Sequence, residues 1–334
     1  MEIVGFASIA DQMNQVLAQS ERLAEKQSEI LQHRFGWHQK TPFIAGVCPH
    51  DDYYYAGRLY ALLLPQLSAK HIILFGVFHQ AKIFQCRDRL VFDSYRTWRG
   101  PYGQISVSPL REEIINRLPE TDYVIDNDMH MVEHSVEAIV PFLQAYHRDV
   151  EIVSILVPYI NWEVLDRLAI NFAEVLQGIL RERKWRLGDD VSIICSSDAV
   201  HYGDEGWGDS DFAHFGADIR GYRKAVKRDV EIADDFLSGA MNLEKLKGFL
   251  HCCVNPDDVT KYRIPWCGRF SVPFGLNVAI RMTEALEGRT LQGYLLDYGT
   301  SISEASLEVD GLGPTAPNNF HHWVGYAALG YQLK

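Results

Sequence analysis

Short apolar runs alternate with longer amphipathic stretches along most of the chain. The apolar runs are rich in β-branched residues and bounded by Gly, Pro, Asp or Ser, which is typical of strands buried on both faces of a sheet. They lie at residues 43–48, 71–76, 151–157 and 191–195, with later strands expected at 291–298 and 324–332. Apolar positions at helical spacing predict helices at 11–33, 56–67, 133–147, 162–184, 217–237, 243–251 and 273–287.

This alternation of strands and helices predicts an α/β fold. We expect a central mixed, largely parallel sheet that is flanked by helices on both faces. No linker rich in Pro, Gly or Ser divides the chain, so we interpret residues 1–334 as a single domain with a helical segment over residues 1–40. Polar loops at 203–213 and 299–322 could form a lid or rim, and the His321–His322 pair of the second loop could reach a site.

Composition excludes several classes of protein. The chain carries a formal net charge of -12 without a long basic run, which argues against a nucleic-acid surface and against docking on an anionic membrane. No signal peptide and no apolar run of the ~18–20 residues that span a bilayer is found, so we expect a soluble, cytoplasmic protein. The six cysteines are dispersed and contain no Cys-x-x-Cys pair, which argues against a disulfide framework or a structural zinc knuckle.

Metal-competent side chains follow the predicted strands. His50 comes soon after the run at 43–48, and His79 comes soon after the run at 71–76. The carboxyl ends of strands are where α/β proteins build sites, and neutral imidazole is the commonest metal ligand in proteins. Cys267 lies in a loop before the last predicted helix, where a thiolate could bind zinc, copper or iron. Each residue also has a structural interpretation, as a hydrogen-bonding His or a buried apolar Cys.

A candidate acid/base pair follows the strand at 191–195. Asp198 could orient His201 or bind metal itself, and His201 could act as a general acid or base near neutral pH; alternatively, Asp198 is an ordinary capping residue. Residues 133–137 read EHSVE, and His134 could line a pocket. The simpler interpretation is that Glu133 and Glu137 are acids that stabilise the N-terminus of a helix. The patterns of phosphate-binding loops, serine hydrolases and zincins are absent, so these chemistries have no support.

Five motifs, in order along the chain, resemble those of the Memo family, which includes protein B of the AmmeMemoRadiSam system. They are PHDDYYYAG at 49–57, EHSVE with a later Pro-Phe at 133–142, SSDAVHYG at 196–203, CGR at 267–269 and GYAA at 325–328. The resemblance covers roughly residues 42–334. It implies a fold akin to that of the class III extradiol dioxygenases, which use non-haem iron.

The resemblance also implies roles for particular residues. Three would be metal ligands, namely His50, His79 and Cys267. Three would lie at the catalytic pocket, namely Asp198, His201 as the acid/base group, and His134. The implied cofactor is a divalent transition metal, with iron or copper expected first and zinc as the alternative.

Three departures from the family motifs affect the site. Asp51 and Asp52 replace Ala-Gly after the first histidine, where they could fix that histidine's tautomer or cap the next helix. Val77 and Phe78 replace smaller or more polar residues before the second histidine, which makes the entrance bulkier and more apolar. Residues 1–40 show no resemblance to the family.

Three functions follow from these residues, and we favour the first. A dioxygenase-like oxidoreductase would act on an unknown small substrate, with a thiolate in place of the carboxylate of extradiol enzymes, which shifts metal preference toward copper or zinc. A metal-dependent hydrolase would use metal-bound water with a pKa lowered toward ~7. A non-catalytic partner or scaffold would instead work with a radical enzyme or other AmmeMemoRadiSam proteins.

Overall fold

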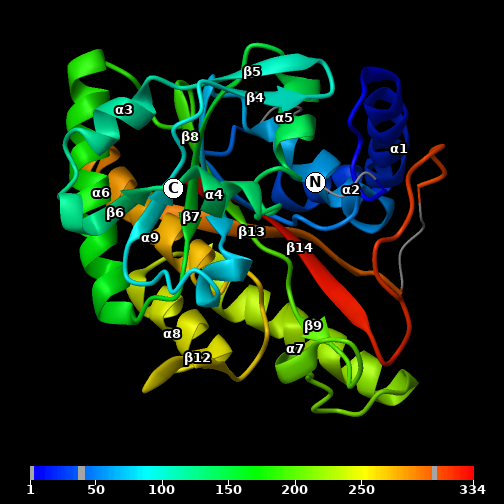
Figure 1. Cartoon of the computed structure of the whole chain (residues 1–334). Helices are drawn as coiled ribbons and strands as arrows, with labels where there is room; N and C mark the ends of the chain where they lie inside the picture. The colour runs from blue at the N-terminus through cyan, green and yellow to red at the C-terminus, as the bar shows by residue number, and fades with distance from the viewer. Residues whose placement is uncertain (1–3, 37–41, 303–306) are drawn as a thin grey trace.

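A β-sheet runs through the centre of the computed structural model, with helices on both of its faces (Figure 1), and the structure describes residues 4–36, 42–302 and 307–334. Within these residues, twelve strands form the sheet. They are β1 (Ala45–Cys48), β2 (His71–Val77), β3 (Leu90–Phe92), β4 (Thr97–Gly100), β5 (Gly103–Val107), β6 (Tyr123–Ile125), β7 (Glu151–Val157), β8 (Val191–Ser196), β9 (His201–Tyr202), β10 (Gly239–Ala240), β13 (Leu291–Thr300) and β14 (Trp323–Leu333). A separate hairpin joins β11 (Val254–Asn255) to β12 (Asp258–Tyr262).

The strand order confirms the predicted mixed, largely parallel sheet. Along the main path the order is β10-β13-β14-β1-β8-β2-β7-β3-β6. The four central strands β1, β8, β2 and β7 are mutually parallel. Antiparallel pairing appears on either side of this block, where β14 joins β1 and β3 joins β7. The carboxyl ends of the four central strands therefore meet at one edge of the sheet.

Two sets of helices cover the two faces of the sheet (Figure 1). One face is packed by α1 (Ala10–Phe35), α2 (Tyr53–Leu63) and α5 (Val140–Tyr146). The other face is packed by α3 (Leu110–Ile115), α6 (Trp162–Arg183), α7 (Ile219–Leu237), α8 (Leu243–Cys253) and α9 (Ser271–Glu287). The short α4 (Asn127–Met131) follows β6.

Side chains of the central strands point alternately into the two helical layers. In β2, Ile73 and Phe75 join the core under α6 and α9, whereas Ile72 and Leu74 join the core under α1 and α2. All seven residues of β2 are buried. A strand that is covered on both faces needs apolar residues at every position, which is why the sequence shows unbroken apolar runs there.

The predicted helix over residues 133–147 is wrong in its first half. Residues 135–139 form turns, and the helix begins only at Val140. The Ser135 hydroxyl donates to the carbonyl of Val77 at 2.8 Å, which holds this segment against the end of β2. Pro141 then lies in the first turn of α5, where its missing N–H leaves no helical hydrogen bond unmade.

The region between β2 and β7 has elements that the apolar pattern did not predict. The strands β3 and β6 have three residues each, and β4 has four, so they are too short to show a periodic pattern. The helix α1 accounts for most of the predicted 1–40 segment, while residues 1–3 and 37–41 of it, and 303–306 of the predicted 299–322 loop, lie outside the described residues. No helix in the described residues is long and apolar enough to cross a membrane.

Candidate metal centre

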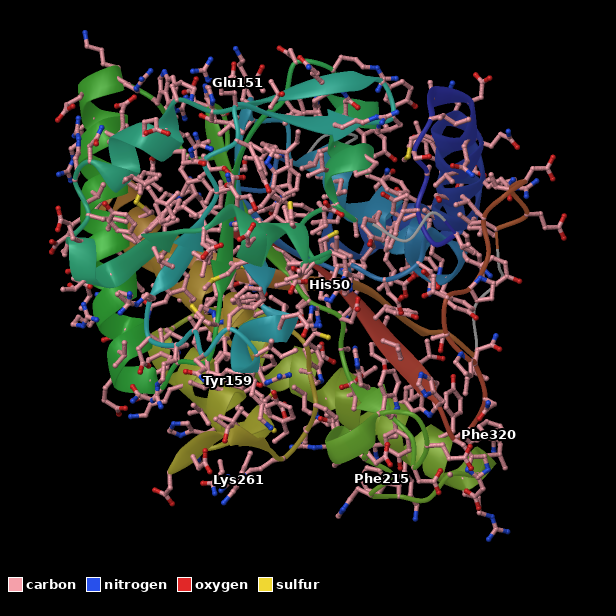
Figure 2. All side chains as sticks on the ribbon, viewed as in Figure 1. His50, Glu151, Tyr159, Phe215, Lys261 and Phe320 are labelled. Atoms are coloured by element: carbon pink, nitrogen blue, oxygen red, sulfur yellow. The ribbon has the colours of Figure 1, made fainter. Side chains whose placement is uncertain are left out.

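The structure brings the six candidate residues together at the carboxyl edge of the central strands. They are His50, His79, His134, Asp198, His201 and Cys267. Three of their segments directly follow β1, β2 and β8. In Figure 2, the labelled His50 and Tyr159 lie toward the same end of the sheet, and Glu151, at the start of β7, lies at the opposite end. Parallel pairing of the central strands is therefore what gathers these distant residues.

Three imidazole rings lie close to one another. The ring centroids of His50 and His79 are 5.2 Å apart, and those of His50 and His134 are 5.6 Å apart. The rings of His79 and His134 stack in parallel at 4.9 Å. The side chain of His50 is 1% exposed and that of His134 is 48% exposed. The cluster thus extends from the protein interior to the surface.

His50 presents a free ring nitrogen inside the cluster. The Ser196 hydroxyl donates to the carbonyl of Ser135 at 2.6 Å, so its oxygen accepts from Nδ1–H of His50 at 2.7 Å. This arrangement leaves a lone pair on Nε2, which is buried and has no hydrogen-bond partner among the described residues. Burial lowers the pKa of His50 well below its usual value, and the imidazoles of His79 and His134 act in the same direction. A neutral imidazole with a free Nε2 is suited to bind a metal ion.

Glu133 orients His79 in the same way. Its carboxylate accepts from His79 Nδ1–H at 2.8 Å and from the His79 backbone N–H at 2.7 Å, so Nε2 of His79 faces the cluster. Burial raises the pKa of Glu133, but the charge and hydrogen bond of His79, with smaller effects of His134 and the Ser135 N–H, outweigh it and lower the pKa to about 2. The interpretation of Glu133 as a helix N-terminal acid is therefore wrong. It is a buried carboxylate behind a candidate metal ligand.

Cys267 completes the inner face of the cluster. Its Sγ lies 3.6 Å from Nε2 of His79 and 2.9 Å from Nε2 of His201. Burial raises the pKa of the Cys267 thiol well above its usual value, and Asp198 adds to this effect. Burial lowers the pKa of His201 to about 3, and His79 and Arg269 contribute. At neutral pH the pair is thus an uncharged thiol that can donate to an uncharged imidazole.

Asp198 contacts His50 and makes no hydrogen bond or ion pair with His201 within the described part of the chain. Its Oδ1 accepts from the His50 backbone N–H at 2.9 Å, and its Oδ2 lies 3.3 Å from Nε2 of His50. Burial and the neighbouring Asp51 raise the pKa of Asp198 well above its usual value. The expectation that Asp198 orients His201 is therefore wrong, and its position beside His50 suits the alternative of a metal-binding carboxylate.

Asp51 and Asp52 neither fix the tautomer of His50 nor cap α2 through their side chains. Asp51 accepts from the Tyr326 hydroxyl at 2.6 Å. Asp52 occupies the N-cap position of α2 without a capping hydrogen bond, and its carboxylate accepts instead from the Thr315 backbone N–H at 2.7 Å. Both acids thus connect the segment after β1 to the C-terminal part of the chain.

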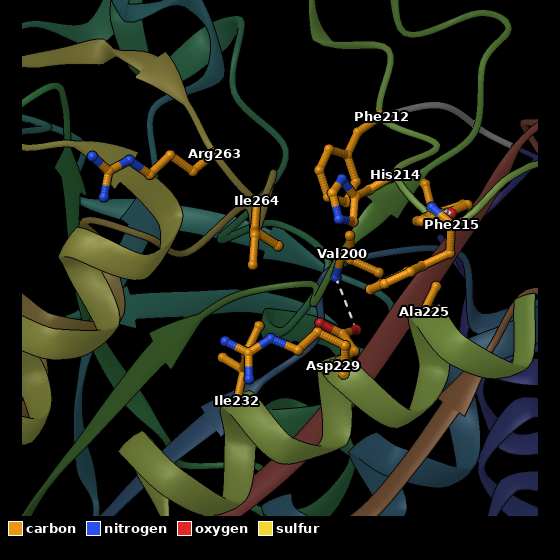
Figure 3. A pocket seen from close by; sticks show the side chains of 11 residues that line it. Val200, Phe212, His214, Phe215, Ala225, Asp229, Ile232, Arg263 and Ile264 are labelled. Atoms are coloured by element: carbon orange, nitrogen blue, oxygen red, sulfur yellow. Dashed lines mark hydrogen bonds between the residues drawn. The ribbon is translucent and has the colours of Figure 1, made fainter. Parts of the chain in front are cut away.

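Asp229 of α7 ties together the two segments that carry His201 and Cys267. Its carboxylate accepts from the Val200 backbone N–H at 3.1 Å, as the dashed line in Figure 3 shows, and from Nε1–H of Trp266. The Tyr298 hydroxyl donates to it at 2.7 Å. Val200 and Trp266 immediately precede His201 and Cys267, so one buried carboxylate sets the spacing of both segments. Burial raises the pKa of Asp229 to about 6, although these three hydrogen bonds act to lower it.

A cavity of about 220 Å³ opens beside His79, His201 and Cys267. Val77 and Phe78 line it, as expected from their place in the sequence. The predicted loop over residues 203–213 contributes Trp207, whose ring lies 4.7 Å from that of His201 and stacks on His322 at 3.8 Å. The two predicted polar loops therefore meet at the rim of the cavity, where His322 supports Trp207 from behind.

The donor atoms fall into two overlapping groups that could hold a metal ion. One group is His50, His79 and His134, and the other is His50, Asp198 and Cys267; within each, the donor atoms lie within 4.8 Å of one another. The predicted ligands His50, His79 and Cys267 are thus divided between two groups that share His50. A tetrahedral metal with bonds of about 2.05 Å to nitrogen and about 2.3 Å to sulfur would place those two atoms about 3.6 Å apart. The separation of His79 Nε2 and Cys267 Sγ is 3.6 Å, which fits such an ion.

A family model described as Memo-like protein matches residues 15–310, which is most of the chain. The chain belongs to the Memo-like protein family. It is 33% identical over 162 residues to a MEMO1 family protein of Archaeoglobus fulgidus, covering 48% of this chain and 55% of that protein. It is 30% identical over 157 residues to a MEMO1 family protein of Aquifex aeolicus, covering 46% and 52%. The chain thus spans about half the length of these curated relatives in the match.

The Memo match also extends beyond the motifs seen in the sequence. The match begins at residue 15, within α1. The expectation that residues 1–40 lack resemblance to the family is therefore wrong for residues 15–40. The sequence motifs contained Ser196 and Arg269 without showing what these side chains do. Asp229 lies in the middle of α7, and no pattern in the sequence points to it. Its role becomes visible only when α7 packs behind the loops of this Memo-like site.

Proposed function

We propose that this Memo-like protein is a metal-dependent, dioxygenase-like oxidoreductase that acts on a small substrate. His50, His79 and Cys267 would hold the metal. The observation that carries this proposal is the orientation of the two histidines. Ser196 and Glu133 accept from the Nδ1–H groups, so both Nε2 atoms point into the cluster, where that of His79 lies 3.6 Å from Cys267 Sγ and that of His50 lies 3.3 Å from Asp198 Oδ2. Hydrogen-bonded partners of this kind are typical of histidines that bind metal in proteins.

The donor set favours a first-row transition metal. Two imidazoles and a thiolate are ligands for iron, copper and zinc rather than for magnesium or calcium. Iron or copper would supply Lewis acidity and one-electron chemistry to a small substrate when bound. Asp198 and His134 are further possible donors, since each belongs to a compact group that includes His50.

The surrounding residues of the chain are suited to handle a proton. Cys267 must lose its thiol proton to bind a metal, and Nε2 of His201 at 2.9 Å is placed to accept it. The low pKa of His201, about 3, keeps this nitrogen unprotonated at neutral pH. His201 also lines the cavity, and once the thiol proton has passed to solvent, the same nitrogen can take a proton from a substrate hydroxyl. Phe78 and Phe270 contribute buried apolar side chains to the lining of this cavity.

The metal content of protein purified without oxygen or chelator tests this function. We expect near-stoichiometric iron or copper in the wild type and its loss in Cys267→Ser. Cys252→Ser is the matched control, because Cys252 is half-buried on α8 and contacts Arg228 instead of the cluster. Oxygen uptake should then depend on the bound metal. Absence of metal from the wild-type protein after reconstitution would refute the proposal.

The same experiment separates the oxidoreductase from a hydrolase. The cluster also matches the ligands of zinc, which binds cysteine thiolates and histidine nitrogens. Stoichiometric zinc with esterase or amidase turnover, and no oxygen uptake, would favour metal-dependent hydrolysis. A non-catalytic partner role stays a prediction: it requires that His50→Ala and Cys267→Ser bind a partner, such as a radical enzyme, as tightly as the wild type does.

A further inference from the structure

The cavity beside Cys267 has one residue that is charged at every physiological pH. Among the residues that line it, Arg269 carries a guanidinium, and the others are apolar, aromatic, hydroxyl, thiol or imidazole groups. A fixed positive charge thus faces a cavity in a chain whose formal net charge is -12.

Arg269 has no acidic partner within the described part of the chain. One terminal nitrogen, Nη1, donates to the carbonyl of Trp266 at 2.6 Å, and the guanidinium lies over the ring of Tyr262 at 3.7 Å. Its Nε is buried and has no hydrogen-bond partner among the described residues. By contrast, the buried Arg111 forms an ion pair with Asp93. A guanidinium has five N–H donors, and the carbonyl of Trp266 accepts from one of them.

Aromatic side chains surround this charge. Tyr159 and Tyr262 share a hydrogen bond between their hydroxyl oxygens at 2.7 Å, which fixes both rings on the side of Arg269. Phe270 packs edge-on against Tyr159, with ring centroids 5.6 Å apart. Trp207 lines the same cavity from the loop at 203–213. The volume of about 220 Å³ is below the ~300–1,000 Å³ of clefts that hold drug-sized ligands, so it suits a single ring.

We propose that the cavity binds a small, flat aromatic carboxylate, whose acid group pairs with Arg269 and whose ring lies among the aromatic walls. A carboxylate matches the flat fork of a guanidinium through two parallel hydrogen bonds. This substrate class rests on the proposed function, because the ring of such a ligand would lie next to His201 and Cys267. It makes Arg269 the residue that selects the substrate by charge.

Isothermal titration of the metal-free full-length chain tests the class of ligand. The probes are benzoate, neutral benzamide, which has the same shape, and acetate, which lacks the ring. We expect benzoate to bind about tenfold or more tightly than either, since the charged pair and the ring contacts both contribute. Equal binding of benzamide would overturn the role of Arg269, and equal binding of acetate would overturn the role of the aromatic walls.

Three variants locate the binding site. Arg269→Ala should lose benzoate affinity by about tenfold or more, and Arg269→Lys should lose part of it, because an ammonium keeps the charge but not the flat fork. Arg148→Lys is the matched control: Arg148 also lies over a tyrosine ring, at 3.3 Å from that of Tyr102, and donates to a backbone carbonyl, that of Gln144. Unchanged benzoate binding in both Arg269 variants would overturn the proposal.

The failure of this inference can be told apart from failure of the proposed function. Binding is measured without metal, so it does not depend on the ligands His50 and His79. If Arg269→Ala fails to fold, as judged by near-ultraviolet circular dichroism, the comparison of Arg269→Lys with Arg148→Lys still decides the outcome. Benzoate binding in a protein that holds no metal would support the ligand class and refute the oxidoreductase.

Discussion

Replacing Glu133 by Gln tests whether the metal centre depends on the charge behind its ligands. The Oε1 atom of Glu133 accepts from His79 Nδ1–H and from the backbone N–H groups of His134 and Ser135, and Oε2 accepts from the His79 backbone N–H. A Gln can keep its oxygen at the Oε1 position, where three donors meet. Its NH₂ group then faces the backbone N–H of His79, so two donors oppose each other in a buried place.

The structure sets the size of the two expected effects. Loss of the carboxylate behind a histidine ligand typically lowers metal affinity about 10–100-fold. A buried donor without a partner costs about 1–3 kcal/mol of folding free energy. The pKa of Glu133 is lowered from 4.5 to about 2, and this difference corresponds to about 3 kcal/mol of stability in the wild type. Because the pKa is lower in the folded state, this stabilisation is present above pH ~4.5 and is lost as the pH falls through ~2.

Two measurements check this prediction. Metal affinity is obtained by competition with a chromophoric chelator, and the free energy of unfolding by urea titration at a series of pH values. The control is Glu182→Gln, because Glu182 is an exposed carboxylate paired with Arg117, and its loss should change neither quantity by more than about 0.5 kcal/mol. If Glu133→Gln binds metal as tightly as the wild type and keeps the same acid dependence of stability, the role assigned to Glu133 is wrong.

Three further substitutions have defined outcomes. The pKa of Asp229 is raised to about 6, so its protonation stabilises the fold fully below pH ~3.9, and this stabilisation is lost as the pH rises through ~6. In urea unfolding, Asp229→Asn should lack this pH dependence, which is worth about 3 kcal/mol. Gly203→Ala should lose about 2 kcal/mol or more in thermal unfolding, because φ is +145° and a Cβ would meet the His321 carbonyl oxygen. Trp207→Ala should speed modification of Cys267 by a thiol reagent, since Trp207 lines its cavity; an unchanged rate would contradict this.

The fold was largely predictable because its central strands are buried on both faces. Such strands need apolar residues at every position, and they alternate with amphipathic helices that cover them. The pattern failed where local sequence competes with long-range contacts. Residues 133–137 have a composition typical of a helix start, but Ser135 and Glu133 bond to the ends of β2 and its following loop instead. That residues 1–334 form a single domain stays a prediction.

The candidate site was predictable as a set of residues but not as an arrangement. His50, His79 and Asp198 could be named because each follows an apolar run. Their hydrogen-bond partners could not, since Ser196 and Glu133 come from other segments. The sequence also allowed Asp198 to orient His201, three residues away, whereas in the fold its carboxylate contacts His50, 148 residues away along the chain.

The sequence by itself determined the layers of the fold, the family motifs and the residue types that can bind a metal, because these depend on local composition and on order along the chain. Only the tertiary structure decided which ring nitrogen each histidine presents, which acid supports it, and that Asp229 aligns the segments of His201 and Cys267. It also decided that Arg269 faces the cavity without an acidic partner in the described residues. These properties depend on distances between segments far apart in sequence, which become fixed when the central strands pair and the helices pack on them.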